Sequence, residues 1–379
     1  MSPERFRKQF PSLADTVHLA SCSQGAASLR LIAALEEFQW SMRSHGAPWD
    51  RWMAEVDTAR RMFAALIGAS PEEVAIVSCA SEGAYQVAST IDWRRRPVIV
   101  SADLEFPSIA HVWLAQGRRD ARVRFVPGDN SAAISDGYTA AIDEIVGLVS
   151  VPLVTYRGGL RFPVGDIAKA AHAAGARVFV DAYQAVGVLP VSVRDVGCDY
   201  LVAGALKYLL GVPGLAFLYV RGGLASDLPP ELTGWFGRVD PFSFDPRTLD
   251  FADSARRFET GTPAIPSAYG AVAGLSTLSE AGADAAAIGR HVSSLAGLCH
   301  NTLTADGERV FSPSDPALRG PQVAIVDDDP GRLSEFLAAR RIVTSPRGDI
   351  LRLSFHYYNN EEDVSTACAA IREYRASRR

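Results

Sequence analysis

Four side chains with acid, base or hydroxyl chemistry come directly after apolar runs of the kind that form buried β-strands. They are Ser81, Thr155, Asp181 and Lys207. In an open α/β sheet, ligands bind beyond the carboxyl ends of the parallel strands, so these side chains are expected at one edge of a sheet. A serine, an acid and a lysine at one edge predict a cofactor site.

Lys207 is the most informative of these residues, because the chain has only three lysines. Lys8 lies in a charged amino-terminal stretch, and Lys169 shares a predicted helix with Asp166, on its solvated face. Lys207 instead lies in AGALKYLLGVPGLAFLY, among apolar residues and glycines that permit close backbone approach. Burial lowers the pKa of a lysine and frees its amine to form an imine. The structural alternative is a lysine that extends from a strand end into water.

Asp181 and Ser81 each have a chemical and a structural interpretation. Asp181 follows a buried strand in FVDAYQ, where its carboxylate needs a cation or hydrogen-bond donors. A protonated pyridine nitrogen is such a partner, and the carboxylate would keep that ring an electron sink; the alternative is a helix N-cap. Ser81 begins the stretch SEGA and opens either a helix whose free N–H groups bind phosphate or an ordinary capped helix.

Short apolar runs alternate with helical spacing from about residue 50, which predicts an α/β doubly wound, mostly parallel sheet. The expected strands are 74–77, 98–101, 123–126, 148–154, 177–181, 200–204 and 215–220. After about residue 255 an Ala/Gly-rich helical region, two further helices and the strand ILRLSF (350–355) predict a smaller α+β domain. We therefore expect a large domain over 20–255 and a small domain over 256–379, on which residues 1–19 pack.

Composition excludes several classes of protein. The formal net charge of −5 argues against a nucleic-acid-binding protein. The start of the chain has no apolar run typical of a signal peptide, and no later stretch is predicted to span a membrane. The five cysteines are scattered without a C-x-x-C pair, which indicates reduced thiols in a cytoplasmic protein and no metal site.

The combination of these motifs resembles the class V branch of fold-type I pyridoxal-phosphate enzymes. That branch includes cysteine desulfurases, class V aminotransferases, isopenicillin N epimerase and kynureninase. The resemblance extends from VHLASCSQGAAS (17–28) to LRLSFHYYNNEEDV (351–364). Its strongest matches are VDAYQAVGVLPVSV, KYLLGVPGLAFLYV, FETGTPAIPSAYG (258–270) and LRLS-x-x-YYN.

The resemblance implies a role for each matching residue. Lys207 would hold pyridoxal phosphate as an internal aldimine and move the α-proton of the substrate, and Asp181 would pair with the pyridinium nitrogen. Gln184 would hydrogen-bond the ring hydroxyl, while Ser81 and the backbone N–H of Glu82 would bind the phosphate.

Two further residues would extend the site to the substrate and to a second subunit. Arg352 would bind the substrate α-carboxylate through its bidentate guanidinium, although a surface ion pair is the usual role of an arginine. Thr262 in G-T-P would reach the phosphate bound by the partner subunit, so the resemblance implies a homodimer.

Some positions distinguish the chain from most of the branch. Phe106 in EFPS stands where desulfurases have a histidine over the cofactor ring, and kynureninase has phenylalanine in a similar context. The TGWFG stretch around Trp235 also resembles kynureninase and makes Trp235 a candidate substrate-binding residue; the alternatives are a core aromatic for Phe106 and a loop anchor for Trp235. His111 is interpreted as an ordinary helix residue. Ala205 and Leu206 replace two polar residues that usually precede the lysine.

The expected function is that of an enzyme acting on an amino acid or an amino-acid conjugate through an external aldimine. The loop TSPRGD (344–349) lacks the thiol that cysteine desulfurases carry before the carboxylate-binding arginine, so desulfurase chemistry is not expected. We expect loss of a β-substituent, either by C–S elimination from a cysteine conjugate or by kynureninase-like C–C cleavage. The alternatives are transamination, then epimerisation, and a non-catalytic regulator that binds the cofactor. A nicotinamide-binding fold is disfavoured because no G-x-G-x-x-G follows an early strand.

Overall fold

The structure is a computed structural model that describes residues 1–128, 134–224, 229–282 and 284–378. Its α-helices are α1 (Pro3–Arg7), α2 (Leu29–His45), α3 (Trp49–Ile67), α4 (Ala80–Ser89), α5 (Pro107–Ala115), α6 (Ile134–Ala141), α7 (Val164–Ala173), α8 (Val193–Val196), α9 (Ile265–Glu280), α10 (Ala285–Ala305), α11 (Pro330–Ala338) and α12 (Glu361–Ala376). Its strands are β1 (Val17–His18), β2 (Val74–Val77), β3 (Val98–Ala102), β4 (Arg122–Val126), β5 (Val146–Pro152), β6 (Arg177–Asp181), β7 (Tyr200–Gly204), β8 (Ala216–Val220), β9 (Gln322–Val326), β10 (Ile342–Val343), β11 (Ser345–Arg347) and β12 (Ile350–Ser354).

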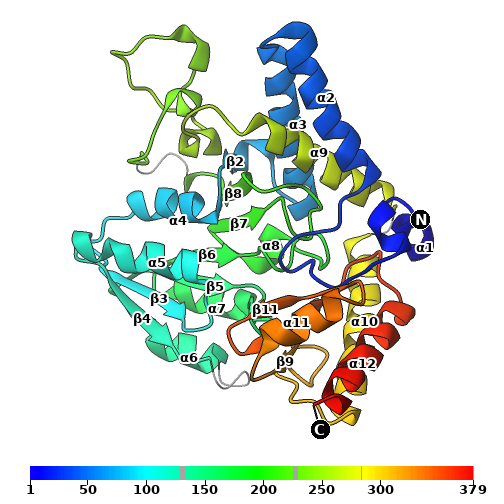
Figure 1. The fold of residues 1–379 in the computed structure, drawn as a ribbon. Helices are drawn as coiled ribbons and strands as arrows, with labels where there is room; N and C mark the ends of the chain where they lie inside the picture. Colours follow the sequence, from blue (N-terminus) through cyan, green and yellow to red (C-terminus); the bar gives the residue numbers. More distant parts are fainter. Residues whose placement is uncertain (129–133, 225–228, 283, 379) are drawn as a thin grey trace.

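A seven-stranded sheet in the order β2-β8-β7-β6-β5-β3-β4 forms the centre of the molecule (Figure 1). The neighbours from β7 to β4 pair in parallel, and β8 is antiparallel to both β7 and β2. Each of the seven apolar runs expected from the sequence overlaps one of these strands. The predicted α/β fold with a mostly parallel sheet is therefore confirmed.

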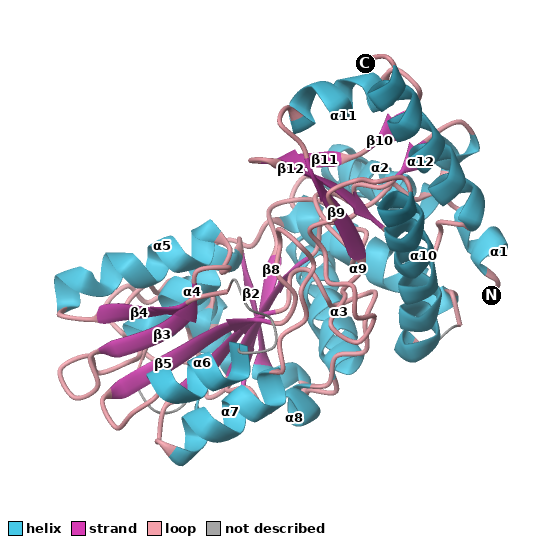
Figure 2. Cartoon of the chain, turned by 90° about the horizontal axis from the view of Figure 1, so that it is seen from below, coloured by secondary structure: helices cyan, strands magenta, loops and turns pink. Residues whose placement is uncertain are grey.

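Helices cover both faces of this sheet, as Figure 2 shows with α4 and α5 on one side and α6 and α7 on the other. Alternate residues of one strand point to opposite faces, so neighbouring residues join different cores. In β2, Ile76 belongs to the core under α3, α6 and α7, whereas Ala75 and Val77 belong to the core under α4 and α5. Burial on both faces explains why the strands are continuously apolar.

A second region packs beside the sheet and contains the carboxyl-terminal helices and a three-stranded sheet in the order β11-β12-β9 (Figures 1 and 2). Near the amino terminus, β1 pairs in parallel with β10 of this region. Helix α9, which the expected boundary at residue 255 assigns to the small domain, lies along α2 and α3. The division of the chain into domains at residue 255 stays a prediction.

No helix in the described part of the chain is both long enough and apolar enough to cross a membrane.

Phe217 of β8 joins the central sheet to α3 and offers a test of this packing. Its ring stacks on that of Phe63 with centroids 4.1 Å apart, and both side chains are fully buried. We expect Phe217→Ala to lower the free energy of unfolding by roughly 3–5 kcal/mol, because it removes apolar contacts and leaves a cavity. Urea denaturation measures this loss. The control is Leu114→Ala, at a side chain of α5 that is 52% exposed, where the change should stay within about 0.5 kcal/mol; equal effects at the two positions would contradict the packing.

Candidate active site

The backbone around Lys207 is held tightly at the end of β7. Residues 205–207 turn away from the strand, and Gly25 approaches so closely that a Cβ there would lie 2.5 Å from the Lys207 carbonyl oxygen. Gly204 likewise leaves room for the Tyr183 side chain, which a Cβ would overlap. The Lys207 Nζ therefore lies 4.8 Å from the centroid of the Tyr183 ring and 5.6 Å from that of Phe106.

A cavity of about 220 Å³ lies in front of this amine, at the carboxyl ends of β5, β6 and β7 and the starts of α4 and α5. The structure thus brings together five residues that the sequence suggested for the site: Ser81, Phe106, Asp181, Gln184 and Lys207. The other lining residues are Cys79, Ala80, Ser108, Pro152, Val154, Tyr156, Tyr183 and Leu206.

The charged groups at this cavity shift one another's pKa values. Burial lowers the pKa of Lys207 to about 8, and the Asp181 carboxylate opposes this shift. The guanidinium groups of Arg352 and Arg347 lower the same pKa further. Burial also raises the pKa of Asp181, against a hydrogen bond of 2.9 Å from the Tyr183 N–H to its Oδ1 and the attraction of Lys207. A cationic ring nitrogen beside Asp181 would offset the cost of its burial.

Glu105 is a second buried carboxyl group at this site, and the sequence interpretation did not identify it. Its Oε1 accepts the Phe106 N–H at 2.9 Å, and its Oε2 accepts the Ser150 Oγ–H at 2.8 Å. Strand register pairs Ser150 with Phe179 and Pro152 with Asp181, so Ser150 and Asp181 face the same side of the sheet. Burial raises the pKa of Glu105 to about 8, and the neighbouring Asp181 carboxylate adds to this shift.

Ser81 and Glu82 lie in the first turn of α4, where the first N–H groups have no acceptor within the helix. The Glu82 carboxylate accepts hydrogen bonds from the Ser78 N–H at 2.7 Å and the Thr260 hydroxyl at 3.1 Å. Its side chain thus fixes the turn before α4 to the segment after Phe258. This leaves the Ser81 hydroxyl and the helix N-terminus as the groups suited to an anion such as phosphate.

Arg352 of β12 is a buried cation without a carboxylate partner among the described residues. Its guanidinium donates to the Tyr156 carbonyl at 2.8 Å, to the Ser345 Oγ at 2.7 Å and to the Ser345 carbonyl at 3.3 Å. These neutral acceptors orient the group but do not balance its charge. A buried arginine in this state is suited to bind a carboxylate of a ligand.

Gln184 provides a test of whether the cavity fits pyridoxal phosphate. One end of its amide donates to the Cys22 carbonyl at 3.1 Å, and its buried Oε1 has no partner among the described residues. A buried polar atom without a partner beside a cavity indicates a ligand group. The acid Asp181, the amine Lys207, the ring of Phe106 and this amide suit a substituted pyridine ring, so the residues fit the cofactor.

Four of the predicted site residues do not line the cavity of their own chain: Glu82 and Arg352, described above, and Thr262 and Trp235. Thr262 is exposed in the loop before α9. Trp235 lies in the segment 229–254 that projects beside α2 in Figure 1, where its ring contacts Trp49, Phe236, Phe242 and Phe244 at centroid distances of 4.4–5.8 Å. Trp235 therefore does not line the cavity in front of Lys207 of the same chain.

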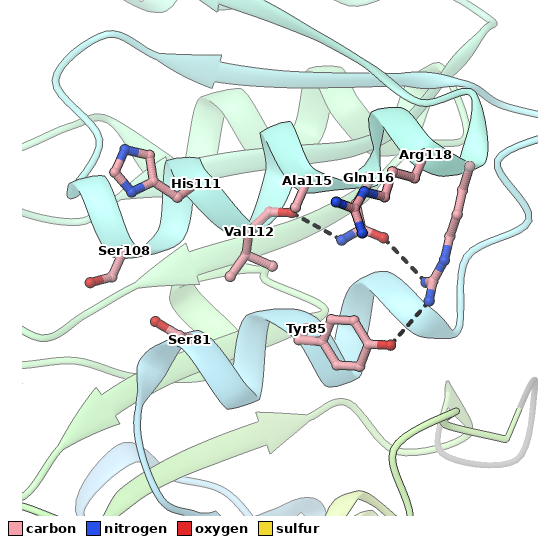
Figure 3. A pocket seen from close by; sticks show the side chains of 9 residues that line it. Ser81, Tyr85, Ser108, His111, Val112, Ala115, Gln116 and Arg118 are labelled. Atoms are coloured by element: carbon pink, nitrogen blue, oxygen red, sulfur yellow. Dashed lines mark hydrogen bonds between the residues drawn. The ribbon is translucent and has the colours of Figure 1, made fainter.

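Four other residues discussed from the sequence supply no group to the proposed chemistry. Thr155 is buried, and its Oγ1 accepts the Leu160 N–H at 3.0 Å, so it closes a turn. Leu206 lines the cavity and Ala205 is buried, so neither supplies a polar contact. His111 lies on α5 in a groove of about 550 Å³ across from Tyr85 of α4, as Figure 3 shows. Ser81 and Ser108 line both this groove and the cavity.

The described residues contain no group of three or more His, Cys, Asp or Glu side chains able to hold a metal ion. The hairpin of β11 and β12 has no cysteine, and Cys299 and Cys368 are buried in α10 and α12. Cys22 is a buried thiol that the sequence interpretation did not place at the site, although its negative charge when ionised would raise the pKa of Lys207.

The pH dependence of stability in a Glu105→Gln variant tests the raised pKa of Glu105, which lies beside the buried Asp181. Because burial raises the pKa of Glu105 from 4.5 to about 8, the folded chain holds a proton that the unfolded chain releases in this window. The wild type therefore loses stability as pH rises from about 4.5 to 8, and the glutamine variant lacks this loss. We expect the urea midpoint of the variant to rise relative to wild type between pH 5 and pH 9. The control Glu335→Gln, at an exposed residue of α11, should follow the wild type. Parallel curves for Glu105→Gln would contradict the assignment.

Comparison with known proteins is consistent with this geometry. The chain is 36% identical over 371 residues to the "Uncharacterized aminotransferase YcbU" of Bacillus subtilis, covering 97% of each chain. It is 32% identical over 272 residues to a kynureninase of Deinococcus radiodurans, covering 68% of this chain and 64% of the relative. The fold is also that of a cysteine desulfurase of Thermococcus onnurineus, with a TM-score of 0.87, 22% identity and coverage of 99% and 98% of the two chains.

The sequence profile of the class-V aminotransferases matches residues 32–366, which is most of the chain. The resemblance stated from the motifs, the fold-type I architecture and the dependence on pyridoxal phosphate are thereby confirmed. With Lys207, Asp181 and the start of α4 gathered at one cavity, the chain belongs to the class-V aminotransferase family of pyridoxal-phosphate enzymes.

Proposed function

We propose that this enzyme, which acts on an amino acid, removes a substituent from its β-carbon, by C–S elimination from a cysteine conjugate. The supporting observation is that Lys207 is the single basic nitrogen among the described residues lining the cavity. Kynureninase-like C–C cleavage is the related form of this proposal and is supported by the kynureninase relative.

When bound, pyridoxal phosphate withdraws electrons from the α-carbon of an amino acid and so acidifies its α-proton. Asp181 would maintain that electron demand through its negative charge next to the ring nitrogen. Lys207, with its pKa lowered to about 8, is able to take the α-proton near neutral pH. Arg352 would bind the α-carboxylate and so orient the α-proton toward the Lys207 amine.

The lining of the cavity favours a leaving group that can depart without being protonated by an acidic side chain. Phe106 is apolar, and burial raises the pKa of the Tyr183 hydroxyl, so that this group keeps its proton at neutral pH. In the elimination, the electron pair of the α-C–H bond forms a Cα–Cβ double bond, and the pair of the C–S bond leaves with sulfur. A thiolate is stable enough to leave in this way, whereas an alkoxide or carbanion requires a proton donor.

Transamination is the second candidate function. It is supported by the relative named as an aminotransferase, which is 36% identical over 97% of the chain. The same groups would serve it, because Lys207 would return the proton to the cofactor instead of expelling a β-substituent.

Desulfurase chemistry is excluded in our proposal, although cysteine desulfurases are among the proteins of the same fold. The support is the absence of a cysteine from the hairpin of β11 and β12, which carries Arg352. Among the described thiols, Cys79 lines the cavity at the start of α4, far from this hairpin in the sequence, and Cys22 is buried in the amino-terminal segment.

A homodimer with shared active sites is also part of the proposal. Thr262 is exposed and outside the cavity of its own chain, as a residue that completes the partner's phosphate site would be. Trp235 would contribute to the substrate site in the same way, and the exposed rings of Phe242 and Phe244 beside it provide an apolar surface for association.

The Lys207 assignment is tested by borohydride reduction of the cofactor-loaded protein. Reduction should attach the pyridoxyl group to Lys207, and peptide mapping by mass spectrometry locates it. Lys207→Ala should remove the label and lower turnover roughly 10²- to 10⁴-fold, because the general base is lost. Lys169→Arg is the control, since Lys169 is 81% exposed and paired with Asp166. A label on Lys169, or on no lysine, would refute the assignment.

The reaction type is tested with a panel of amino acids and cysteine S-conjugates. Elimination should release pyruvate, ammonia and one thiol per turnover without an added keto acid, because the α-proton and the β-substituent are both lost. The products are measured by coupled assay and thiol titration. Turnover that depends on a keto acid acceptor would replace the proposal by transamination, and release of alanine with sulfur transfer would replace it by desulfurase chemistry.

A further inference from the structure

The β11–β12 hairpin presents two arginines on one face. The strands pair so that Ser345 lies opposite Arg352 and Arg347 lies opposite Ile350. Residues two apart in a strand share a face, so Arg347 projects to the same side as Ser345 and Arg352. Arg347 and Arg352 are diagonal neighbours, whose side chains lie about 7–8 Å apart at their bases and are long enough to converge.

Arg347 is exposed and has only neutral hydrogen-bond partners. It donates to the Pro346 carbonyl at 2.8 Å and to the Ser23 hydroxyl at 3.5 Å. Within the described ranges it forms no ion pair, because the nearby Asp349 carboxylate is bound by Arg157. Two guanidinium groups on one face repel each other unless an anion lies between or beside them.

Arg347 does not line the cofactor cavity, but its guanidinium contacts the amino-terminal segment that packs on the cavity wall, a position we call the rim. Ser23, which it contacts, follows Cys22, and the Cys22 carbonyl is bound by Gln184 in the cavity wall. The positive charge of Arg347 also lowers the pKa of Lys207, as that of Arg352 does. Both guanidinium groups therefore lie within electrostatic reach of the amine.

We propose that Arg347, together with the Ser23 hydroxyl, binds a second carboxylate on the substrate, so that the enzyme prefers amino acids or conjugates with an acidic side chain. This inference rests on the proposed function, in which Arg352 binds the α-carboxylate. Arg352 is buried and rigidly bonded, whereas Arg347 is exposed at the rim. The first would recognise the group common to amino acids, and the second would select the side chain.

A carboxylate suits this position better than a phosphate monoester. A phosphate monoester carries nearly two negative charges and three strong acceptor oxygens. At the rim, Arg347 provides one uncommitted cation and Ser23 one hydroxyl, while Arg157 is already paired with Asp349. One guanidinium and one hydroxyl match the single charge and two oxygens of a carboxylate.

The test compares the binding of maleate, a dicarboxylate, with that of maleamate, in which one carboxylate is an amide. Isothermal titration calorimetry of the cofactor-loaded protein at low salt measures both affinities. The wild type should bind maleate about five- to tenfold more tightly than maleamate, because only maleate places an anion at Arg347. Arg347→Gln should abolish this difference while changing maleamate affinity less than about twofold.

Two control variants separate this inference from the proposed function. Arg352→Ala should weaken both ligands, because it removes the site of the carboxylate they share. Arg309→Gln, at an exposed arginine paired with Asp328, should change neither. If Arg347→Gln keeps the preference for maleate, or if the wild type has none, the second carboxylate site is refuted. Binding does not require turnover, so this result is independent of the lysine-labelling experiment.

Kinetics with matched substrates gives a second readout. S-carboxymethylcysteine and its amide differ only in the distal acid, as do glutamate and glutamine for a transaminase. Arg347→Gln should raise KM for the acid about five- to tenfold and leave kcat and the KM of the amide nearly unchanged. Equal effects on acid and amide would show a general structural role for Arg347 and would overturn the proposal.

Discussion

The amine of Lys207 and the carboxyl group of Asp181 share one cavity of about 220 Å³, and the charge of each shifts the pKa of the other. Burial favours the neutral form of both groups, while their mutual attraction favours the charged forms. In the absence of another cation, the Asp181 carboxylate depends on the charged form of Lys207 for its counter-charge. A second cation beside Asp181 would supply that counter-charge. The pyridinium nitrogen of the cofactor is such a cation, and its arrival would leave the lysine amine free to react.

The positions of these groups follow from packing that can be recognised in the sequence. Continuous apolar runs define β5, β6 and β7, and parallel strands end at the same edge, so Asp181 and Lys207 were expected together. The scarcity of lysine made the choice of Lys207 direct, since Lys169 carries an ordinary surface ion pair with Asp166. The fold class and the centre of the site were thus predictable because both depend on local patterns and on one rule of sheet geometry.

The groups around that centre were less predictable, because they depend on contacts between segments far apart in the chain. Glu105 is held near Asp181 by its hydrogen bond from Ser150. Ser150 lies on the same face of the sheet as Asp181 because of the register of β5 and β6, which the sequence does not reveal. The one sequence signal for Glu105 was its place directly before Phe106. Arg352 is oriented by the carbonyl of Tyr156, and no pattern in the sequence specifies that pairing. The resemblance implies a substrate-binding role for Trp235, yet its ring packs on Trp49 and does not line the cavity of its own chain.

The charged residues around the cavity are coupled electrostatically. Lys207, Arg352 and Arg347 supply positive charge around the cavity, and the Asp181 carboxylate opposes it. Glu105 adds little negative charge, because its pKa of about 8 keeps it largely protonated at neutral pH. The site therefore carries a positive surplus that anionic ligands neutralise. Each carboxylate that binds an arginine cancels one of the charges that lower the pKa of Lys207, so the amine becomes a stronger base once the substrate is in place. The proton-accepting strength of Lys207 would thus be coupled to recognition of the carboxylate, and water in the free enzyme would meet a weaker base than the α-carbon of a bound amino acid does.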